Sequence, residues 1–160
     1  MSETGVSDES VDRSELKRSM EESTTRAGTV SAAFAMAVAL GLPWMRWPKV
    51  SDGEDDRLLF DLWRTFTSRY ESQDVTIMRV AAFSAVAATI ICLVGAWRRW
   101  SPTDVVLAPR IAILTLIAAI GYVEFGTSYI WSDAGVYVAL VIQVGLCLLW
   151  TSASRRCRRD

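Results

Sequence analysis

The sequence predicts an all-α fold, namely an integral membrane four-helix bundle with an amphipathic interfacial helix in its first outer loop. Hydrophobic residues make up 51% of the chain and the mean hydropathy is +0.24, although 22% of the residues are charged. The charges cluster outside four apolar stretches. Tryptophans lie at the ends of these stretches, and the Trp ring prefers the membrane–water boundary. The predicted membrane-interface anchors are Trp44, Trp47, Trp97, Trp100, Trp131 and Trp150.

The first 26 residues are polar and rich in Ser and Glu. They contain too few large apolar side chains to bury the surface that ordering requires. We therefore expect residues 1–26 to be a disordered cytoplasmic tail that contains at most a weak helix around 11–22.

The first apolar stretch, over residues 27–44, is rich in alanine, uncharged and interrupted at Pro43. Its length suits a bilayer span of about 20 residues. A cleaved signal peptide is the rival interpretation, because Ala33-Phe34-Ala35 places small residues around a bulky one. The polar leader is longer and more acidic than the usual start of a signal peptide, which favours a span.

The longest loop follows, and it contains the pattern of an amphipathic helix over about 53–70. Ser51-Asp52-Gly53-Glu54 has the spacing of a helix capping box. Apolar residues then recur at helical intervals, so that one face is apolar. We expect this helix to lie on the membrane surface or over the mouth of the bundle. The predicted partner or interface surface is Leu58, Leu59, Leu62, Trp63, Phe66 and Tyr70.

Three further spans are predicted over about 77–97, 111–130 and 135–151, which completes a membrane domain of residues 27–152. Ser101-Pro102 has the pattern of a helix start, and Pro109 either starts the third span or kinks a longer helix from Pro102. Residues 131–134 are expected to be a tight turn, and residues 153–160 a basic cytoplasmic tail.

Basic residues predict the orientation. With the N-terminus inside, 11 of the 17 Lys and Arg residues lie on the inner side, so the positive-inside rule favours both termini in the cytoplasm of a bacterial inner (plasma) membrane. Arginines beside the spans are expected to bind anionic headgroups. These are Arg98, Arg99, Arg155, Arg156, Arg158 and Arg159.

Glu124 is the acidic residue placed well inside a predicted span, about six residues or roughly 9 Å from its outer end. Gln143 lies at a similar predicted depth in the next span, so the two are expected to form an interhelical polar pair. A carboxyl group in hydrocarbon is costly unless it is protonated, hydrogen-bonded or hydrated. Contact with a partner subunit, and proton or ligand handling, are the alternatives to this structural role.

Catalytic chemistry is not expected. The chain has no histidine, and its three cysteines share no close spacing, so no metal or cofactor site follows. The acidic run around Asp52–Asp56 lacks the ligand spacing of a calcium loop, and helix capping explains it. A net charge of −1 gives no basic field for nucleic acid.

The end of the first span, Leu42-Pro43-Trp44, is followed by a loop containing Gly53 and Asp61-Leu62-Trp63. In this respect the chain resembles a loose group of small, largely uncharacterised actinobacterial four-span membrane proteins, over about residues 27–159. The resemblance implies topology and no activity. Some small envelope proteins of this kind are accessory subunits of larger complexes, including lipid transporters of the mammalian-cell-entry type.

The function expected from the sequence is therefore a non-catalytic accessory or scaffold subunit of a larger cell-envelope membrane complex, with a lipid transporter as one such complex. Its partners would be the lipid bilayer and that membrane-protein complex. The alternative is a small homo-oligomeric channel or transporter that uses Glu124.

Overall fold

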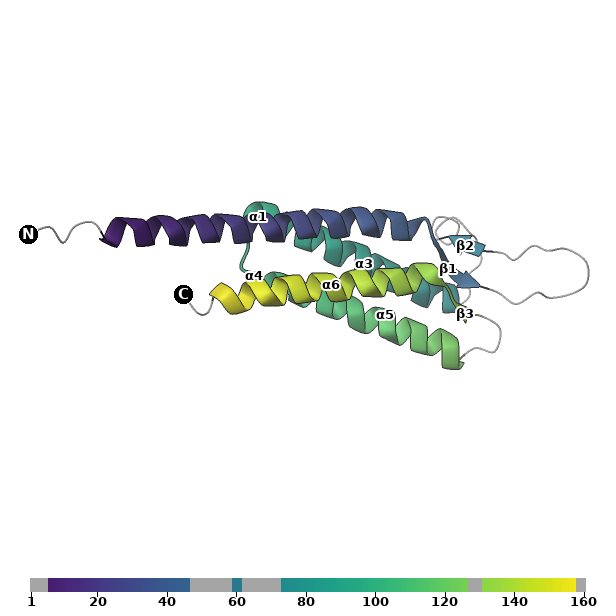
Figure 1. Ribbon diagram of the computed structural model, residues 1–160. Helices are drawn as coiled ribbons and strands as arrows, with labels where there is room; N and C mark the ends of the chain where they lie inside the picture. The colour runs from purple at the N-terminus through teal and green to yellow at the C-terminus, as the bar shows by residue number, and fades with distance from the viewer. Residues whose placement is uncertain (1–5, 47–58, 62–72, 127–130, 158–160) are drawn as a thin grey trace, which may run out of the picture.

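The computed structural model describes residues 6–46, 59–61, 73–126 and 131–157, and every structural statement below concerns these residues. They are almost entirely helical, which confirms the all-α class (Figure 1). The helices are α1 (Val6–Leu40), α3 (Gln73–Arg98), α4 (Pro102–Val105), α5 (Leu107–Gly126) and α6 (Ala134–Cys157).

The long helices form a bundle in which α3 packs against α5, and α1 packs against α6 and α3. Helix α1 begins and α6 finishes at one end of this bundle, which we call the termini end (Figure 1). A small sheet closes the opposite end, which we call the sheet end. The bundle therefore has two distinct ends, one carrying both ends of the described chain and the other carrying the strands.

Three of the described helices are long and apolar enough to cross a membrane, as the sequence predicted for the last three spans. They are Val75–Arg98, Pro102–Gly126 and Ala134–Arg156. The second of these begins at Pro102, so Pro109 lies within a longer helical segment and in the first turn of α5. A proline is tolerated there because the first N–H groups of a helix have no partner within it.

Helix α1 differs from the expectation of a disordered tail, because it is continuous from Val6 to Leu40. Helix nucleation is costly, whereas extension from a formed helix adds one hydrogen bond per residue. The packed second half of α1 thus supports the polar first half. Two acidic side chains of the polar half, Glu21 and Glu22, also pair with Arg156 and Arg99 at 3.6 and 3.5 Å. The amino-acid composition of residues 1–26 could not reveal the extension from a packed helix or the two ion pairs.

The sheet at the sheet end contains three antiparallel strands in the order β2-β1-β3. Central strand β1 (Pro43–Arg46) pairs with β2 (Leu59–Asp61) on one edge and with β3 (Trp131–Ser132) on the other. Pro43 is the first residue of its strand, where a missing N–H is tolerated. The residues expected to be a tight turn before α6 thus contribute a strand.

Strand β2 shows that the predicted amphipathic helix over 53–70 is wrong at Leu59–Asp61. Met45 pairs with Phe60 and Arg46 with Leu59, so backbone pairing with β1 overrides the helical spacing of the side chains. The other residues of the proposed interface lie outside the described residues. They are Leu58, Leu62, Trp63, Phe66 and Tyr70.

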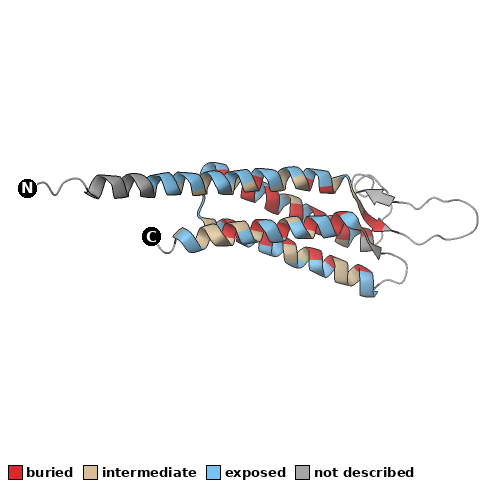
Figure 2. Ribbon diagram, in the orientation of Figure 1, coloured by how far each residue is buried: buried red, intermediate tan, exposed pale blue. Residues whose placement is uncertain are grey.

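The buried residues face the bundle axis on every long helix (Figure 2). Many are small, which lets helices approach closely where lipid provides no hydrophobic drive for association. Helix α3 illustrates this with a buried series of Ala81, Ala85, Ala88, Cys92 and Ala96. Larger side chains fill the two ends, with Trp44 and Met45 at the sheet end and Trp150 at the termini end. The opposite helix faces carry large exposed apolar side chains.

Candidate functional site

The most buried polar contact joins α6 to α3 in the middle of the bundle. Gln143 is fully buried, and its Nε2 donates to the carbonyl oxygen of Ala85 and to Oγ1 of Thr89, both at 2.9 Å. The Thr89 hydroxyl itself donates to Ala85 O at 2.8 Å. The second acceptor of the amide, Gln143 Oε1, is buried without a hydrogen-bond partner. This contact fixes the register of α6 against α3.

The predicted pair between Glu124 and Gln143 is wrong. Gln143 bonds to α3 through Ala85 and Thr89. Glu124 lies in the last turn of α5 before Gly126 and is exposed, while Gln143 lies about 13 Å along α6 from its start at Ala134. Residues 127–130 of the predicted third span lie outside the described residues.

Glu124 instead closes the turn between α5 and α6. Its Oε1 accepts a hydrogen bond from the backbone N–H of Ser132 at 2.9 Å and one from the Tyr137 hydroxyl at 3.5 Å. Ser132 belongs to β3 and Tyr137 to the first turn of α6. The carboxylate thus links the end of one helix, a strand and the start of the next helix at the sheet end.

Trp44 is not an exposed anchor, because its side chain is fully buried. Its Nε1 donates to the carbonyl oxygen of Ala39 at 3.0 Å, which also accepts from the backbone N–H of Leu42 at 3.2 Å, so the ring is joined to the end of α1. Gly135 makes room for the ring: a Cβ there would lie 2.5 Å from Cδ1 of Trp44 and 2.8 Å from the Pro43 carbonyl oxygen. The Leu-Pro-Trp sequence therefore closes the core.

The other tryptophans divide in the same way. Trp97 and Trp100 are exposed at the termini end, as expected of membrane-interface anchors. Trp150 is buried beside Gly95 and Val105, with no hydrogen-bond partner for its Nε1, so the anchor role assigned to it is wrong. Trp47 and the side chain of Trp131 lie outside what the structure describes.

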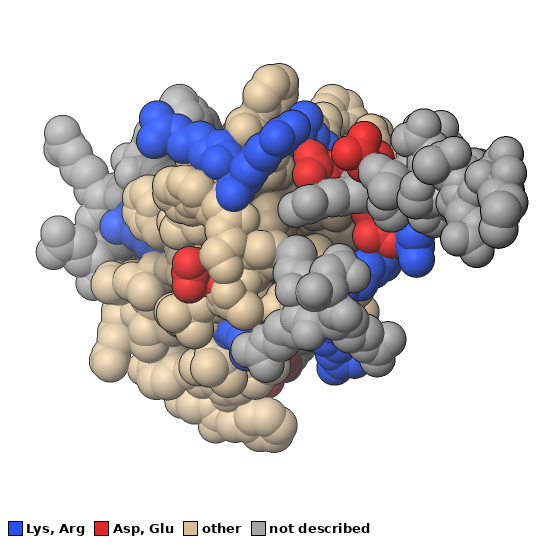
Figure 3. Space-filling model, turned by 90° about the vertical axis from the view of Figure 1, so that its left-hand side faces the viewer, with Lys and Arg blue, Asp and Glu red and all other residues tan. Residues whose placement is uncertain are grey.

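Exposed arginines gather at the termini end, which Figure 3 views head-on. Arg98 is the last residue of α3 and Arg99 follows it, and Arg155 and Arg156 lie in the last turn of α6. Arg99 pairs with Glu22 and Arg156 with Glu21, so two of these arginines hold the polar half of α1. Arg158 and Arg159 lie outside the described residues.

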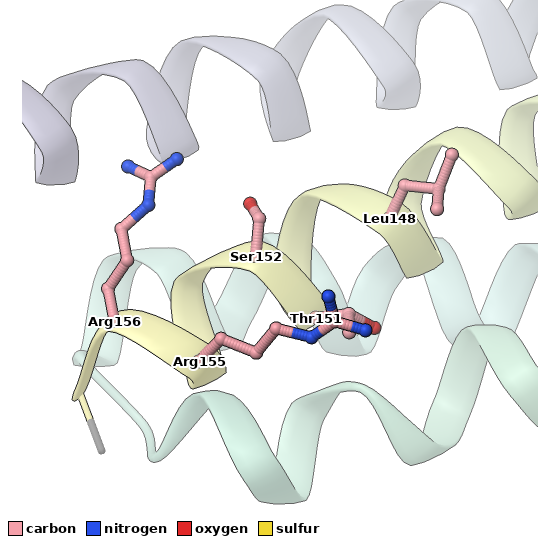
Figure 4. A pocket seen from close by; sticks show the side chains of 5 residues that line it. All are labelled: Leu148, Thr151, Ser152, Arg155 and Arg156. Atoms are coloured by element: carbon pink, nitrogen blue, oxygen red, sulfur yellow. The ribbon is translucent and has the colours of Figure 1, made fainter. Parts of the chain in front are cut away.

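A shallow pocket of about 450 Å³ opens on α6 near this end (Figure 4). Its lining combines an apolar side chain, two hydroxyl side chains and two guanidinium groups. These are Leu148, Thr151, Ser152, Arg155 and Arg156. Arg156 extends toward α1, whereas Arg155 lies along α6 toward Thr151 (Figure 4). Of the sequence-predicted site residues, the structure brings Arg155 and Arg156 together here.

Sequence reasoning missed the partners of both polar side chains that it singled out. Thr89 and Ala85 could not be identified as partners from the sequence, because a threonine or alanine in an apolar stretch is commonplace.

The structure also shows Arg26 Nε donating to the Ala96 carbonyl oxygen at 3.2 Å. Within the described ranges no three His, Cys, Asp or Glu residues lie close enough to hold a metal ion.

Comparison with known proteins adds no relative: no protein-family model, curated protein or solved structure matches this chain.

Proposed function

We propose that this chain is a non-catalytic accessory or scaffold subunit of a larger membrane complex in a bacterial inner membrane, with both termini in the cytoplasm. The single observation that carries the proposal is helix α1. It has 35 residues, which is about 52 Å at 1.5 Å per residue. A hydrocarbon core is about 30 Å thick, so part of this helix must extend beyond it.

We propose that the second half of α1, from about Ala27, is the fourth span. One of its faces is buried in the bundle through Thr29, Met36 and Ala39. Large apolar side chains on the other face remain exposed at intervals of four residues, which suits contact with lipid. They are Val30, Phe34 and Val38. The apolar part as far as Leu40 covers only about 21 Å, and the buried Trp44 extends it at the sheet end.

The polar half of α1 supports the scaffold role. It projects past the other helices at the termini end (Figure 1) and exposes the apolar side chains of Leu16 and Met20, each 64% accessible. These residues are one helical turn apart, so they lie on the same face. A firmly anchored helix that presents such a face in water is suited to bind a protein partner.

The arginines of the termini end favour a cytoplasmic location for that end under the positive-inside rule. The resemblance to actinobacterial four-span proteins makes a lipid transporter one candidate for the larger complex. The alternative of a homo-oligomeric channel gains no support from Glu124, which is exposed and bonded within its own turn.

The test is purification of the full-length tagged chain from native membranes in a mild detergent. We expect co-purification with a large membrane complex, and loss of that complex in the double variant Leu16→Asp, Met20→Asp. The matched control is Ser19→Asp, Ser23→Asp, which adds the same charge to exposed positions of the same helix. Equal recovery of the complex with both double variants would show that α1 is not the partner surface. A single homo-oligomer that conducts ions in liposomes would favour the channel.

A further inference from the structure

We propose that the α6 pocket is a binding site for the phosphate of an anionic phospholipid headgroup, with an acyl chain lying along Leu148. This inference concerns lipid selectivity and does not require a protein partner, so it stands apart from the scaffold proposal.

The chemistry of the lining selects an anion. Arg155 supplies a planar guanidinium group, which suits the oxygens of a phosphate, and it lies along α6 toward Thr151, whereas the Ser152 hydroxyl donates to the Leu149 carbonyl oxygen at 2.7 Å. No carboxylate is among the lining residues. The lining therefore presents positive charge and the Thr151 hydroxyl, while the neighbouring carboxylate of Glu21 is paired with Arg156.

The two arginines of the pocket have different tasks. Arg156 pairs with Glu21 of α1 at 3.6 Å, so its charge is already partly compensated. Arg155 has no ion pair among the described residues, and it lies along α6 toward Thr151 (Figure 4). Arg155 is thus the cation available to a ligand, and Arg156 holds the neighbouring wall against α1.

The pocket lies at the depth of lipid headgroups. Next to Thr151, the ring of Trp150 lies 3.7 Å from the Cβ position of Gly95, two residues before the exposed Trp97. Exposed tryptophans mark the membrane–water boundary, so the hydroxyl pair is level with that boundary. Arg155 lies about one turn beyond it on the water side.

The apolar end of the pocket points the opposite way along α6. Leu148 is 66% exposed and about one turn closer to the bilayer centre than Thr151 and Ser152. Seven residues separate it from Arg155, or about 10 Å along the helix. A cation, the Thr151 hydroxyl and an exposed leucine thus follow one another along the membrane normal, as do the phosphate, the backbone and the upper acyl chain of a phospholipid.

The experiment measures retained lipid on the purified full-length chain by native mass spectrometry. Neutral detergent micelles would contain phosphatidylglycerol and phosphatidylcholine with identical acyl chains. We expect the wild type to prefer phosphatidylglycerol by about fivefold, the effect expected of one arginine near an anionic surface. Arg155→Gln should abolish the preference. Arg98→Gln, which removes an exposed arginine from the same end outside the pocket, should keep it.

Two further measurements distinguish a specific binding pocket from a general attraction between anionic lipid and positive charge. Thr151→Val keeps the shape of the side chain while removing its hydroxyl, and it should weaken retention of phosphatidylglycerol without altering folding. Inorganic phosphate at millimolar concentration should fail to displace phosphatidylglycerol, because it makes no contact with Leu148. Equal losses in Arg155→Gln and Arg98→Gln, or displacement of the lipid by inorganic phosphate, would overturn the proposal.

Discussion

Trp44 at the sheet end and Trp97 at the termini end lie in opposite environments. At the sheet end, Trp44 is fully buried against Gly135 and its indole N–H bonds to the Ala39 carbonyl oxygen. At the termini end, Trp97 is 74% exposed beside exposed arginines. Residue type and position in the sequence are alike in the two cases, since both tryptophans follow an apolar stretch. The deciding factor is whether a small residue from another helix makes room for the ring.

The ends also differ in how charge is used. Glu124 of the sheet end bonds to a backbone N–H and a tyrosine hydroxyl within its own turn. The termini end instead joins α1 to α3 and α6 through exposed ion pairs, which contribute little to stability. The sheet end is thus held by packing and hydrogen bonds, and the termini end leaves charge available for lipid or protein partners.

The comparison predicts that truncation of Trp44 has the largest effect on stability. Trp44→Ala should cost about 3–5 kcal/mol, because it removes a fully buried ring and leaves a cavity at the sheet end. Trp97→Ala should change stability by less than about 0.5 kcal/mol, because that ring packs against solvent or lipid. Thermal unfolding of the purified chain in one detergent measures both. Similar losses in the two variants would contradict the comparison.

The close approach of Gly135 to Trp44 predicts the next largest effect. Gly135→Ala should cost about 1–3 kcal/mol, since its Cβ would overlap the indole ring and the backbone oxygen of Pro43. Gly145 lies in the same helix with nothing within 4 Å of its Cβ position. Gly145→Ala should therefore be neutral or stabilise by about 0.5–1 kcal/mol, because alanine is the better helix former. Equal changes in stability for the two alanine variants in the same unfolding assay would show that the close contact of Gly135 with Trp44 does not stabilise the sheet end.

Much of the helical framework could be predicted because its signal is local. Long apolar runs from Ile77, Ile111 and Gly135 are sufficient to define spans, and three described helices follow them. The extension of α1 and the strand at Leu59–Asp61 could not be predicted in this way. Each depends on a partner far away in the sequence, namely the packed half of the bundle in one case and strand β1 in the other.

The polar side chains illustrate the same limit. Gln143 could be recognised as a polar residue within an apolar stretch, but its partners Ala85 and Thr89 lie 58 and 54 residues away in the sequence, and no local pattern indicates them. Arg155 could be expected near headgroups from charge alone. Its position beside Thr151, which itself lies about one turn from the exposed Leu148, could be found only from the structure.

The smallest predicted effect concerns the region between the two ends, where Gln143 meets Thr89. Gln143→Leu should cost about 0.6 kcal/mol and at most about 1.7 kcal/mol, the range of interhelical hydrogen bonds within membranes. The cost is limited because leucine also removes the unpaired Oε1, while Thr89 keeps its own bond to the Ala85 carbonyl oxygen. Thr89→Val in the Gln143→Leu background should then add less than it does alone, since residues in contact are energetically coupled. Glu124→Leu in that background should be additive, because its bonds lie in a different turn. The opposite result would be energetic coupling of Gln143 to Glu124 and none to Thr89. It would support the pair that the sequence predicted and contradict the observed register of α6 against α3.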